Sequence, residues 1–318
     1  MILTVTLNPS LDEWAWLPRL RVGALNRATR AARYPGGKGI NVSRVAHELG
    51  YPTMALALAG GDDGEILSRL LSQQRIAHQF VTVPGSTRNN YQLQTKTPPT
   101  LTQVNTPGPR VSVAVLARLS RRLAALSASA QAVVCSGSLP PGAPPSTYRR
   151  LIARLNRRVL TVLDASGPAL REGLRARPWL IKPNRQEAEE LLGCRLRRAR
   201  DVLRGAQALC EQGAQHAIIS LGGAGAVLAS AKTRQVWRAQ APKVRVQSAV
   251  GAGDALVAGL LVGWLRTRSM EQAFRLGVAC GSATAMTPGT ELCHRADVER
   301  LRSRVTLRML DVAGTGAL

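Results

Sequence analysis

Short apolar runs that alternate with helical patterns place the strongest constraint on how this chain can fold. The runs at 1–7, 53–60 and 131–137 are almost continuously apolar, as expected of strands buried on both faces. A helical apolar period is present at 40–50, where Gly50 closes the segment. Repeated alternation of this kind predicts a mostly parallel sheet with helices on both faces. The same patterns predict further strands at 159–166, 178–184 and 216–222, and further helices at 64–74, 145–158, 185–193, 253–266 and 270–286.

Two segments interrupt this alternation. Residues 12–35 and about 86–107 lack a helical period, and the second is rich in threonine and asparagine. We interpret both as strands of a small sheet that stands off the main domain, with a turn at Pro98-Pro99. The chain is therefore predicted to form one domain over 1–310 that carries this small sheet. Residues 311–318 are small and polar and are predicted to be a flexible tail.

The composition excludes several classes of protein. The 318 residues contain no apolar run near the roughly 20 needed to span a bilayer, and the N-terminus "MILTVTLNPSLDEW" lacks the pattern of a signal peptide. Five scattered cysteines without a disulfide framework indicate a reducing compartment, so we expect a cytoplasmic protein. The cysteines and the four histidines lack the spacing of a zinc site.

A formal net charge of +24 raises the alternative of a nucleic-acid-binding protein. The basic residues are 38 arginines and only 5 lysines, spread along the chain, and the one dense cluster is "CRLRRAR" at 194–200. Aromatic residues placed to stack on bases are absent from this pattern. We therefore favour a bias toward arginine that gives a solvated basic surface, and we expect no nucleic-acid partner. Such a surface would still attract anionic substrates.

Glycine-rich loops occur at four strand–helix junctions. They are "PGGKGIN" at 35–41, "GSLPPG" at 137–142, "SLGGAGA" at 220–226 and "VGAGD" at 250–254. One such loop is weak evidence, because glycines also serve ordinary turns. Ligands of open α/β sheets bind at the carboxyl ends of the strands, so four loops of this kind predict a ligand site there.

The last of these loops precedes a lone acid and a long apolar helix. Gly251, Ala252 and Gly253 let backbone N–H groups approach an anion, and the helix start adds partial positive charge. Such a hole suits a phosphoryl group in transit, and Asp254 beside it could accept the proton of an attacking hydroxyl. From this stretch alone, Asp254 could equally be a helix N-cap.

Taken together, the motifs resemble the PfkB-type, ribokinase-like carbohydrate kinases over nearly the whole chain. The resemblance rests on "TLNPSLD", "PGGKGINVSRVAHELG", "STRNN", "SGSLPPG", "PWLIKPNRQEAEELLG", "SLGGAGA" and "VGAGDALVAGLL", in this order. These motifs are most similar to the branch that contains 1-phosphofructokinase, tagatose-6-phosphate kinase and the minor 6-phosphofructokinase. The resemblance implies a three-layer sandwich around a mostly parallel sheet, with a small β-strand lid.

The resemblance assigns roles around the sugar. Asp254 would be the general base, and Gly251, Ala252 and Gly253 would form the anion hole. Arg88 would grip the phosphate already on the sugar through charge-assisted, forked hydrogen bonds. The remaining residues expected to bind the sugar phosphate are Asp12, Gly37, Lys38, Asn41, Asn90 and Ser138. Asp12 could instead be a turn residue, and Lys38 a solvated loop lysine.

The resemblance also assigns the nucleotide side and its cofactors. Asn184 and Glu187 form an N-x-x-E motif that, with Asp164, would organise Mg²⁺ and its waters around the phosphates of ATP. Glu187 could instead be an acid in the first turn of a helix. The nucleotide loop would be formed by Ser220, Leu221, Gly222 and Gly225.

Some consequences of the resemblance stay open. Ala249 and Ala255 depart from the usual residues around the base, and the loop with Thr287 and Glu291 leaves a monovalent-cation requirement undecided. The lid is expected to form a homodimer interface. Sugar-side motifs favour fructose 1-phosphate as substrate, and 276–293 is more similar to the minor 6-phosphofructokinases. Fructose 6-phosphate and tagatose 6-phosphate are therefore the alternatives, and a non-catalytic sugar-phosphate-binding protein is the alternative of another class.

Overall fold

A large sheet of mixed direction forms the centre of the molecule. The computed structural model describes residues 1–233 and 235–310, so the predicted tail at 311–318 lies outside the described residues. The strand order of the ten-stranded sheet is β14-β13-β12-β11-β10-β9-β8-β1-β4-β5. Pairing is parallel from β5 through β11 and antiparallel from β11 to β14. The strands are β1 (Ile2–Thr6), β4 (Thr53–Ala59), β5 (His78–Thr82), β8 (Ala132–Ser136), β9 (Leu160–Asp164), β10 (Leu180–Ile181), β11 (His216–Ser220), β12 (Ala226–Ser230), β13 (Val236–Gln240) and β14 (Thr306–Leu310).

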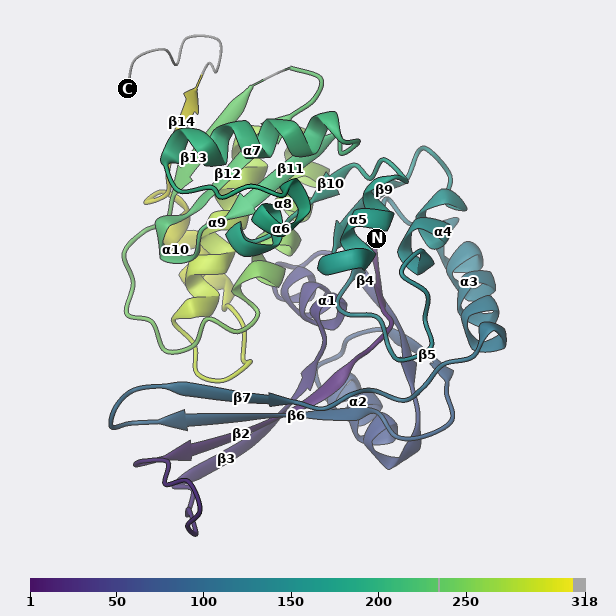
Figure 1. The fold of residues 1–318 in the computed structure, drawn as a ribbon, viewed down its shortest axis with the longest axis vertical. Helices are drawn as coiled ribbons and strands as arrows, with labels where there is room; N and C mark the ends of the chain where they lie inside the picture. The colour runs from purple at the N-terminus through teal and green to yellow at the C-terminus, as the bar shows by residue number, and fades with distance from the viewer. Residues whose placement is uncertain (234, 311–318) are drawn as a thin grey trace.

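Helices cover both faces of this sheet (Figure 1), as the alternating pattern predicts. Because the parallel strands are apolar on both sides, each face forms its own core against a helical layer. One layer contains α1 (Lys38–Glu48), α2 (Gly61–Gln73), α8 (Ala252–Thr267), α9 (Met270–Ala285) and α10 (Arg295–Arg302). The other contains α3 (Val113–Ser127), α4 (Thr147–Ala153), α5 (Gly167–Leu174), α6 (Arg185–Leu192) and α7 (Ala199–Glu211).

A second, four-stranded sheet projects from the main body below the strand ends (Figure 1). Its order is β3-β2-β6-β7, and we call it the small sheet. The strands are β2 (Ser10–Leu17), β3 (Arg30–Gly36), β6 (Arg88–Thr95) and β7 (Leu101–Asn105). They arise from the two segments that lack a helical period. The ring of Trp14 is buried and stacks on that of Trp16 at 5.5 Å.

Two predicted elements are shorter in the structure. The helix predicted over 145–158 ends at Ala153, because Arg154 and Leu155 bond to carbonyls three residues back and Asn156 forms a turn with Arg158. The strand predicted over 178–184 pairs only at β10, because the chain is bounded by Pro178 and Pro183, which lack the N–H that a ladder needs.

Candidate active site

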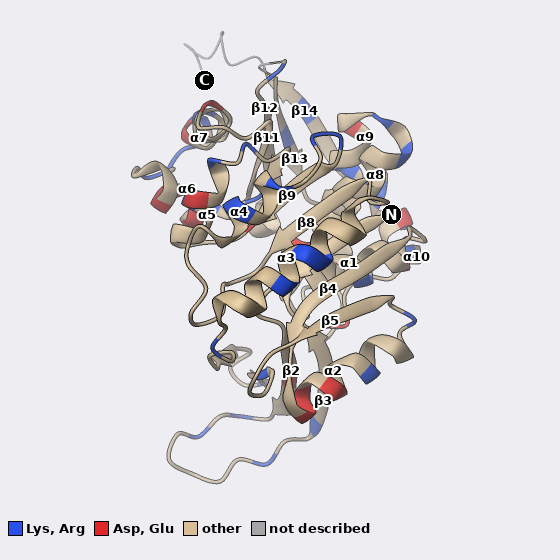
Figure 2. Ribbon diagram, turned by 90° about the vertical axis from the view of Figure 1, so that its right-hand side faces the viewer, with Lys and Arg blue, Asp and Glu red and all other residues tan. Residues whose placement is uncertain are grey.

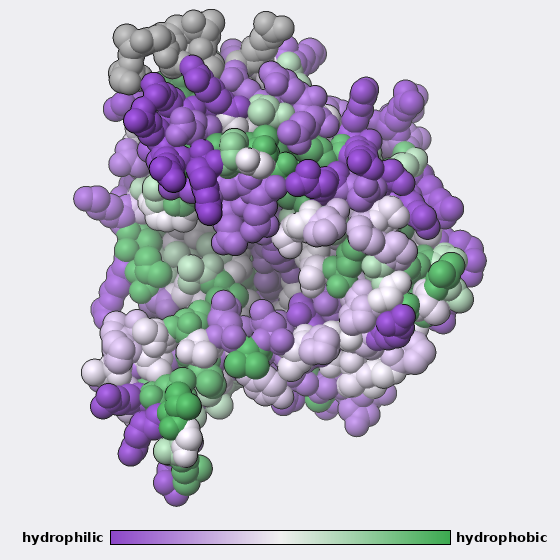
Figure 3. All heavy atoms as spheres, in the orientation of Figure 1, coloured by the Kyte–Doolittle hydropathy of each residue, from purple (hydrophilic) through white to green (hydrophobic). Residues whose placement is uncertain are grey.

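The carboxyl ends of the parallel strands place the predicted polar residues in one row. Register pairs Thr6 of β1 with Ser136 of β8, and Ser136 with Asp164 of β9. Lys182 follows β10 directly, and an isolated bridge joins Asn184 to Ser220 at the end of β11. Residues from distant motifs therefore meet along this edge, where the space-filling view is hollowed between the main body and the small sheet (Figure 3).

Asp254 lies in the first turn of α8 with its carboxylate turned to α1. The N-cap of α8 is Gly251, which adopts a left-handed conformation (φ 80°), and the cap has no side-chain hydrogen bond. The N-cap interpretation of Asp254 is therefore wrong. Asn41 Nδ2 donates a 2.8 Å hydrogen bond to Asp254 Oδ2, which joins two motifs more than two hundred residues apart. The side chain is buried but lies beside the predicted anion hole of Gly251, Ala252 and Gly253.

A second buried carboxylate, Asp164, lies between two lysines. Lys38 Nζ donates a 2.9 Å hydrogen bond to Asp164 Oδ1, and Lys182 Nζ lies 3.4 Å from Oδ2. A Cβ added to Gly253 would lie 3.1 Å from Lys182 Nζ, so the second ammonium sits directly under the anion hole. The alternative that Lys38 is a solvated loop residue does not hold, because its amine forms an ion pair with the fully buried carboxylate of Asp164.

These surroundings shift the pKa values of the two carboxyl groups in opposite directions. Burial raises the pKa of Asp164, but the charges of Lys182 and Lys38 outweigh burial and leave that pKa below its usual value. Burial and the charge of Asp164 raise the pKa of Asp254 to about 7, with Lys38, Asn41 and Lys182 acting in the opposite sense. Two acids held apart in this way suit two roles, one permanently charged and one that exchanges protons near neutrality.

Asp12 forms the centre of a hydrogen-bond cluster at the base of the small sheet. Its Oδ1 accepts from Ser10 Oγ (2.9 Å) and Asn90 Nδ2 (3.2 Å), and its Oδ2 accepts from Thr290 Oγ1 (3.2 Å). Register places Asn90 directly opposite Asp12, so the structure brings these two predicted residues together. Thr290 also accepts from Trp14 Nε1 at 2.9 Å, which ties the small sheet to the loop after α9.

Gly36 and Gly37 allow the chain to pass close to this cluster. A Cβ on Gly36 would lie 2.4 Å from Asp12 Oδ1, and Gly37 has φ 114°, which disfavours other residues. Gly37 is the N-cap of α1, so it also directs Lys38 and Asn41 toward the strand ends. The loop "PGGKGIN" therefore turns the chain and also positions the side chains of Lys38 and Asn41.

Arg88 and Ser138 line one cavity of about 510 Å³ at the end of this row. Arg88 donates to the carbonyls of Thr106 (3.4 Å) and Asn8 (3.2 Å), and its buried Nε has no partner among the described residues. Asn8 Nδ2 donates to Ser138 Oγ at 3.1 Å. Burial lowers the pKa of Arg88, and the charge of Asp12 acts in the opposite direction. An arginine with an unused buried donor is prepared to bind an anion.

The N-x-x-E motif forms a capping box in this structure. Asn184 Oδ1 accepts from the Glu187 amide at 2.9 Å, and Glu187 Oε2 accepts from the Asn184 amide at 2.8 Å. Both side chains therefore hold the start of α6, which agrees with the structural interpretation of Glu187 and leaves its role at a metal a prediction. Ser220, Leu221, Gly222 and Gly225 surround a short 3₁₀ turn next to this helix start.

The donor set on this side fits Mg²⁺ held mostly through water. Asp164 is engaged by two lysines, although its buried Oδ2 has no hydrogen-bond partner among the described residues. Asn184 and Glu187 present oxygens that already accept backbone bonds. Magnesium keeps several waters and usually takes one or two protein carboxylates together with phosphate oxygens, which matches this arrangement. Within residues 1–233 and 235–310, no group of three His, Cys, Asp or Glu side chains could hold a metal by itself.

Sequence reasoning missed several residues of this site. Lys182 stands in the quoted segment "PWLIKPN", but its contact with Asp164 depends on the pairing of β9 and β10. Asn8 and Thr290 were not predicted as site residues either. The rarity of lysine in an arginine-rich chain could have indicated a specific role for Lys182, as it did for Lys38.

Lys and Arg residues are spread over helices and strands of both layers (Figure 2), and the arginine bias inferred from the sequence stays a prediction. The described part of the chain contains no helix that is long and apolar enough to cross a membrane.

Comparisons with known proteins identify the family to which this chain belongs. A model of the pfkB family of carbohydrate kinases matches residues 7–297. The chain is 38% identical to 1-phosphofructokinase of Bacillus subtilis (strain 168) over 294 residues, which cover 92% of this chain and 95% of the relative. It is 36% identical over 302 residues to the ATP-dependent 6-phosphofructokinase isozyme 2 of Mycobacterium tuberculosis (strain CDC 1551 / Oshkosh), covering 94% and 88%.

A solved structure agrees in fold. Phosphofructokinase-2 from Escherichia coli in complex with potassium superposes with a TM-score of 0.89 at 31% identity, covering 95% of this chain and 98% of that one. The mostly parallel sheet between helical layers, with a second small sheet, is the ribokinase-like fold that the resemblance implied, and ribokinase from Thermotoga maritima shares this fold with a TM-score of 0.77 at 19% identity, covering 95% of this chain and 99% of that one. The prediction of a sugar-phosphate kinase is likewise confirmed, and the chain belongs to the pfkB family of carbohydrate kinases.

Proposed function

We propose that this kinase transfers the γ-phosphoryl group of ATP to fructose 1-phosphate and forms fructose 1,6-bisphosphate. The observation that carries the proposal is the pairing of a buried base, Asp254, with a separate arginine cavity around Arg88. A substrate that already carries one phosphate needs an anion grip away from the reacting hydroxyl, and Arg88 with its unused Nε supplies one.

Asp254 acts as the general base. Its ionised carboxylate accepts the proton of the sugar hydroxyl as the oxygen attacks the γ-phosphorus, and the bond from that phosphorus to the bridging oxygen of ADP breaks. The Asn41 hydrogen bond fixes the carboxylate toward the strand ends. Because the pKa of Asp254 is about 7, the base is ionised in an increasing fraction of molecules as the pH rises through neutrality.

The anion hole and the two lysines stabilise the transferred group. Backbone amides at the start of α8 face the phosphoryl oxygens, and Lys182 lies beneath Gly253 to add a full positive charge. Lys38 and Lys182 keep Asp164 ionised, so that this acid holds a negative charge at the nucleotide side. Bound Mg²⁺ would supply charge neutralisation of the phosphates, with Asp164, Asn184 and Glu187 as the residues that hold it through water.

Asp12, Asn90 and Ser138 orient the sugar. Asp12 and Asn90 are adjacent in register, and Asn90 Oδ1 and Asn8 Oδ1 are buried without hydrogen-bond partners in the described chain. Sugar hydroxyls satisfy such groups, since each can donate and accept. The small sheet carries two of these residues, so we assign it the role of a lid that excludes water from the phosphoryl group.

The small sheet also offers an interface to a second copy of the chain. Tyr91 and Val104 lie opposite each other across β6 and β7, and the two residues are 45% and 50% exposed. A second chain that covered this pair would remove apolar surface from water. We therefore propose a homodimer through the small sheet, which light scattering of wild type and a Tyr91→Asp variant tests. A monomeric wild type would remove this proposal.

A coupled assay of ATP consumption tests the substrate. Fructose 1-phosphate, fructose 6-phosphate, tagatose 6-phosphate and unphosphorylated fructose are compared with ATP and Mg²⁺, in sodium and in potassium buffers. We expect the highest kcat/KM with fructose 1-phosphate. A higher value with fructose 6-phosphate would favour the second candidate, a 6-phosphofructokinase. The Mycobacterium tuberculosis relative and the segment 276–293 support that alternative. No turnover with any of the sugars would contradict the proposed substrates altogether.

A further inference from the structure

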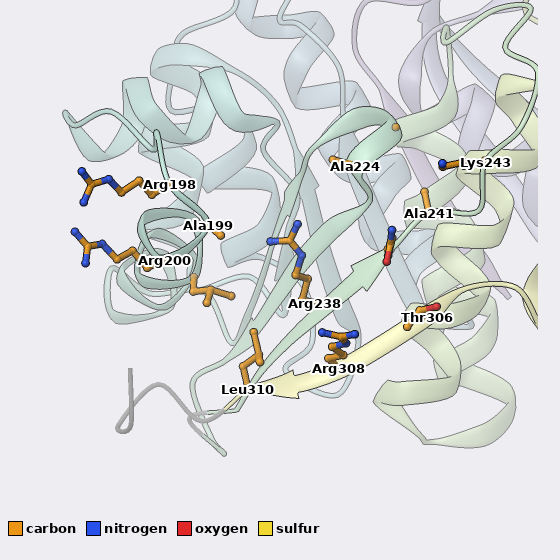
Figure 4. Close-up of a pocket in the computed structure, with 13 residues that line it drawn as sticks. Arg198, Ala199, Arg200, Ala224, Arg238, Ala241, Lys243, Thr306, Arg308 and Leu310 are labelled. Atoms are coloured by element: carbon orange, nitrogen blue, oxygen red, sulfur yellow. The ribbon is translucent and has the colours of Figure 1, made fainter. Parts of the chain in front are cut away.

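A second cavity lies outside the catalytic row, at the antiparallel edge of the large sheet (Figure 4). It has a volume of about 820 Å³ and lies between the start of α7, strands β13 and β14, and the 3₁₀ turn after β11. We call it the β13–β14 pocket. None of the residues assigned above to the base, the anion hole or the sugar lines it.

The lining of the β13–β14 pocket is strongly basic. It contains no acidic residue, and one of its basic residues, Arg200, pairs with Asp201 outside the lining at 3.9 Å. Within residues 1–233 and 235–310, none of the other basic lining residues forms an ion pair. The five basic residues are Arg198, Arg200, Arg238, Lys243 and Arg308.

Two of these arginines oppose each other within the sheet. Arg238 of β13 and Arg308 of β14 are direct partners in antiparallel register. Residues opposite each other have Cβ atoms about 5 Å apart, and like charges at this spacing destabilise a sheet. In Figure 4 both side chains enter the same space, whereas Arg198 and Arg200 extend outward from the start of α7.

The arginine bias alone does not account for this arrangement. A biased surface would place guanidinium groups on convex, solvated faces, whereas Arg238 and Arg308 enter one concave site whose lining contains no acidic residue. We infer that the β13–β14 pocket binds a small molecule that carries two or more phosphoryl groups. A tetrahedral phosphoryl group has oxygens for two guanidinium forks at once, which removes the repulsion between Arg238 and Arg308. The pocket volume suits a small molecule, because ligand sites are about 300–1,000 Å³.

The pocket shares a wall with the proposed nucleotide loop. Gly223 and Ala224 line it, and they are part of the turn that begins after Ser220. A ligand held there changes the environment of this turn and thereby links its occupancy to nucleotide binding. This link rests on the proposed function, whereas the binding itself does not.

Hydrogen–deuterium exchange with inorganic tripolyphosphate tests the site at constant ionic strength near 0.15 M. We expect slower exchange of wild-type peptides that cover 236–243 and 304–310. The double variant Arg238→Gln/Arg308→Gln loses this protection and binds the probe at least about ten-fold more weakly, since it removes the charge-assisted hydrogen bonds of both guanidinium groups. The unliganded double variant also melts at a higher temperature than wild type, because the repulsion is gone.

The matched control removes two charges elsewhere. Arg121 and Arg122 are exposed on α3 and do not line the pocket, and Arg121→Gln/Arg122→Gln retains the protection. The inference is overturned if tripolyphosphate leaves 236–243 and 304–310 unchanged, or if both double variants lose protection equally. Protection by a 20-base-pair DNA duplex but not by tripolyphosphate would overturn it in favour of a nucleic-acid surface. The readout needs no turnover, so a protein inactive on every sugar phosphate would contradict the proposed function and leave this test intact.

Discussion

The proposed sugar side and the proposed nucleotide side of the active site differ in how their polar groups are satisfied. On the sugar side, Arg88 Nε, Asn8 Oδ1 and Asn90 Oδ1 are buried without partners among the described residues. On the nucleotide side, Asn184 and Glu187 satisfy each other's backbone through the capping box. The sugar-side groups are therefore free to recognise a ligand without giving up a hydrogen bond within the protein. The nucleotide-side groups hold the start of a helix and would have to contact the ligand at the same time.

Removal of the base between the two sides gives the largest expected effect. Asp254→Asn keeps the shape of the side chain and the Gly251 N-cap of α8, but it cannot accept the hydroxyl proton. We expect kcat to fall by about 10³-fold or more while ATP binding is retained. Steady-state kinetics and a nucleotide titration measure the two quantities, and a loss of only a few-fold would contradict the role of Asp254 as base.

A sugar-side variant sharpens the comparison from one direction. Arg88→Met removes the anion grip without disturbing a helix, so we expect KM for the sugar phosphate to rise about 100-fold and KM for ATP to stay within about two-fold. Arg33→Met is the matched control, because Arg33 also lies in the small sheet but pairs with Glu13. Equal effects of both variants on the sugar KM would argue against a specific role for Arg88.

A variant on the proposed nucleotide side tests the same comparison in a second way. Glu187→Gln weakens both the capping box and the proposed metal water shell, so we expect about 1 kcal/mol lower stability and a roughly ten-fold higher Mg²⁺ requirement. Asp201→Asn on α7 is the control, since Asp201 accepts a 2.8 Å bond from the Arg198 amide in the same way. It is expected to lower stability only. An unchanged Mg²⁺ requirement in Glu187→Gln would leave Glu187 a purely structural residue.

The smallest effect concerns stability and pH. The pKa of Asp254 is raised from 3.8 to about 7, so the folded protein binds a proton there that the unfolded chain has released. This contribution to stability is complete below about pH 4 and is lost as the pH rises through about 7. We therefore expect Asp254→Asn to melt at a higher temperature than wild type at pH 8, and this gain to shrink at pH 5.

Differential scanning fluorimetry at both pH values checks this prediction. Asp62→Asn serves as the control, because Asp62 is exposed on α2. A gain for Asp254→Asn that is equal at pH 8 and pH 5 would show that its ionisation does not oppose folding.

Local patterns predicted much of the fold but only part of the site. Apolar runs located β1, β4, β8 and β11 because a buried parallel strand has few polar positions. Helix α7 was not predicted, because the dense charges of "CRLRRAR" mask its start, although buried Val202, Ala206 and Leu209 follow a helical period.

Contacts between distant segments account for what the sequence could not give. The glycine loop identified Asp254, but nothing local indicated that Asn41 would bond to it. The rarity of lysine marks Lys182, but its contact with Asp164 depends on the pairing of β9 with β10, since Asp164 belongs to the neighbouring strand. Asp12 and Asn90 were selected separately, and the parallel register of β2 and β6 made them a pair.

The link through Thr290 bears on how easily the small sheet can move. One hydroxyl accepts from Trp14 and donates to Asp12, so the small sheet is fastened to the main body next to Asp12. Moving the sheet away breaks both bonds and exposes the buried Trp14 ring to water. Such an opening step costs more than the motion of a free loop, so we expect the small sheet to slow the departure of any ligand that it covers.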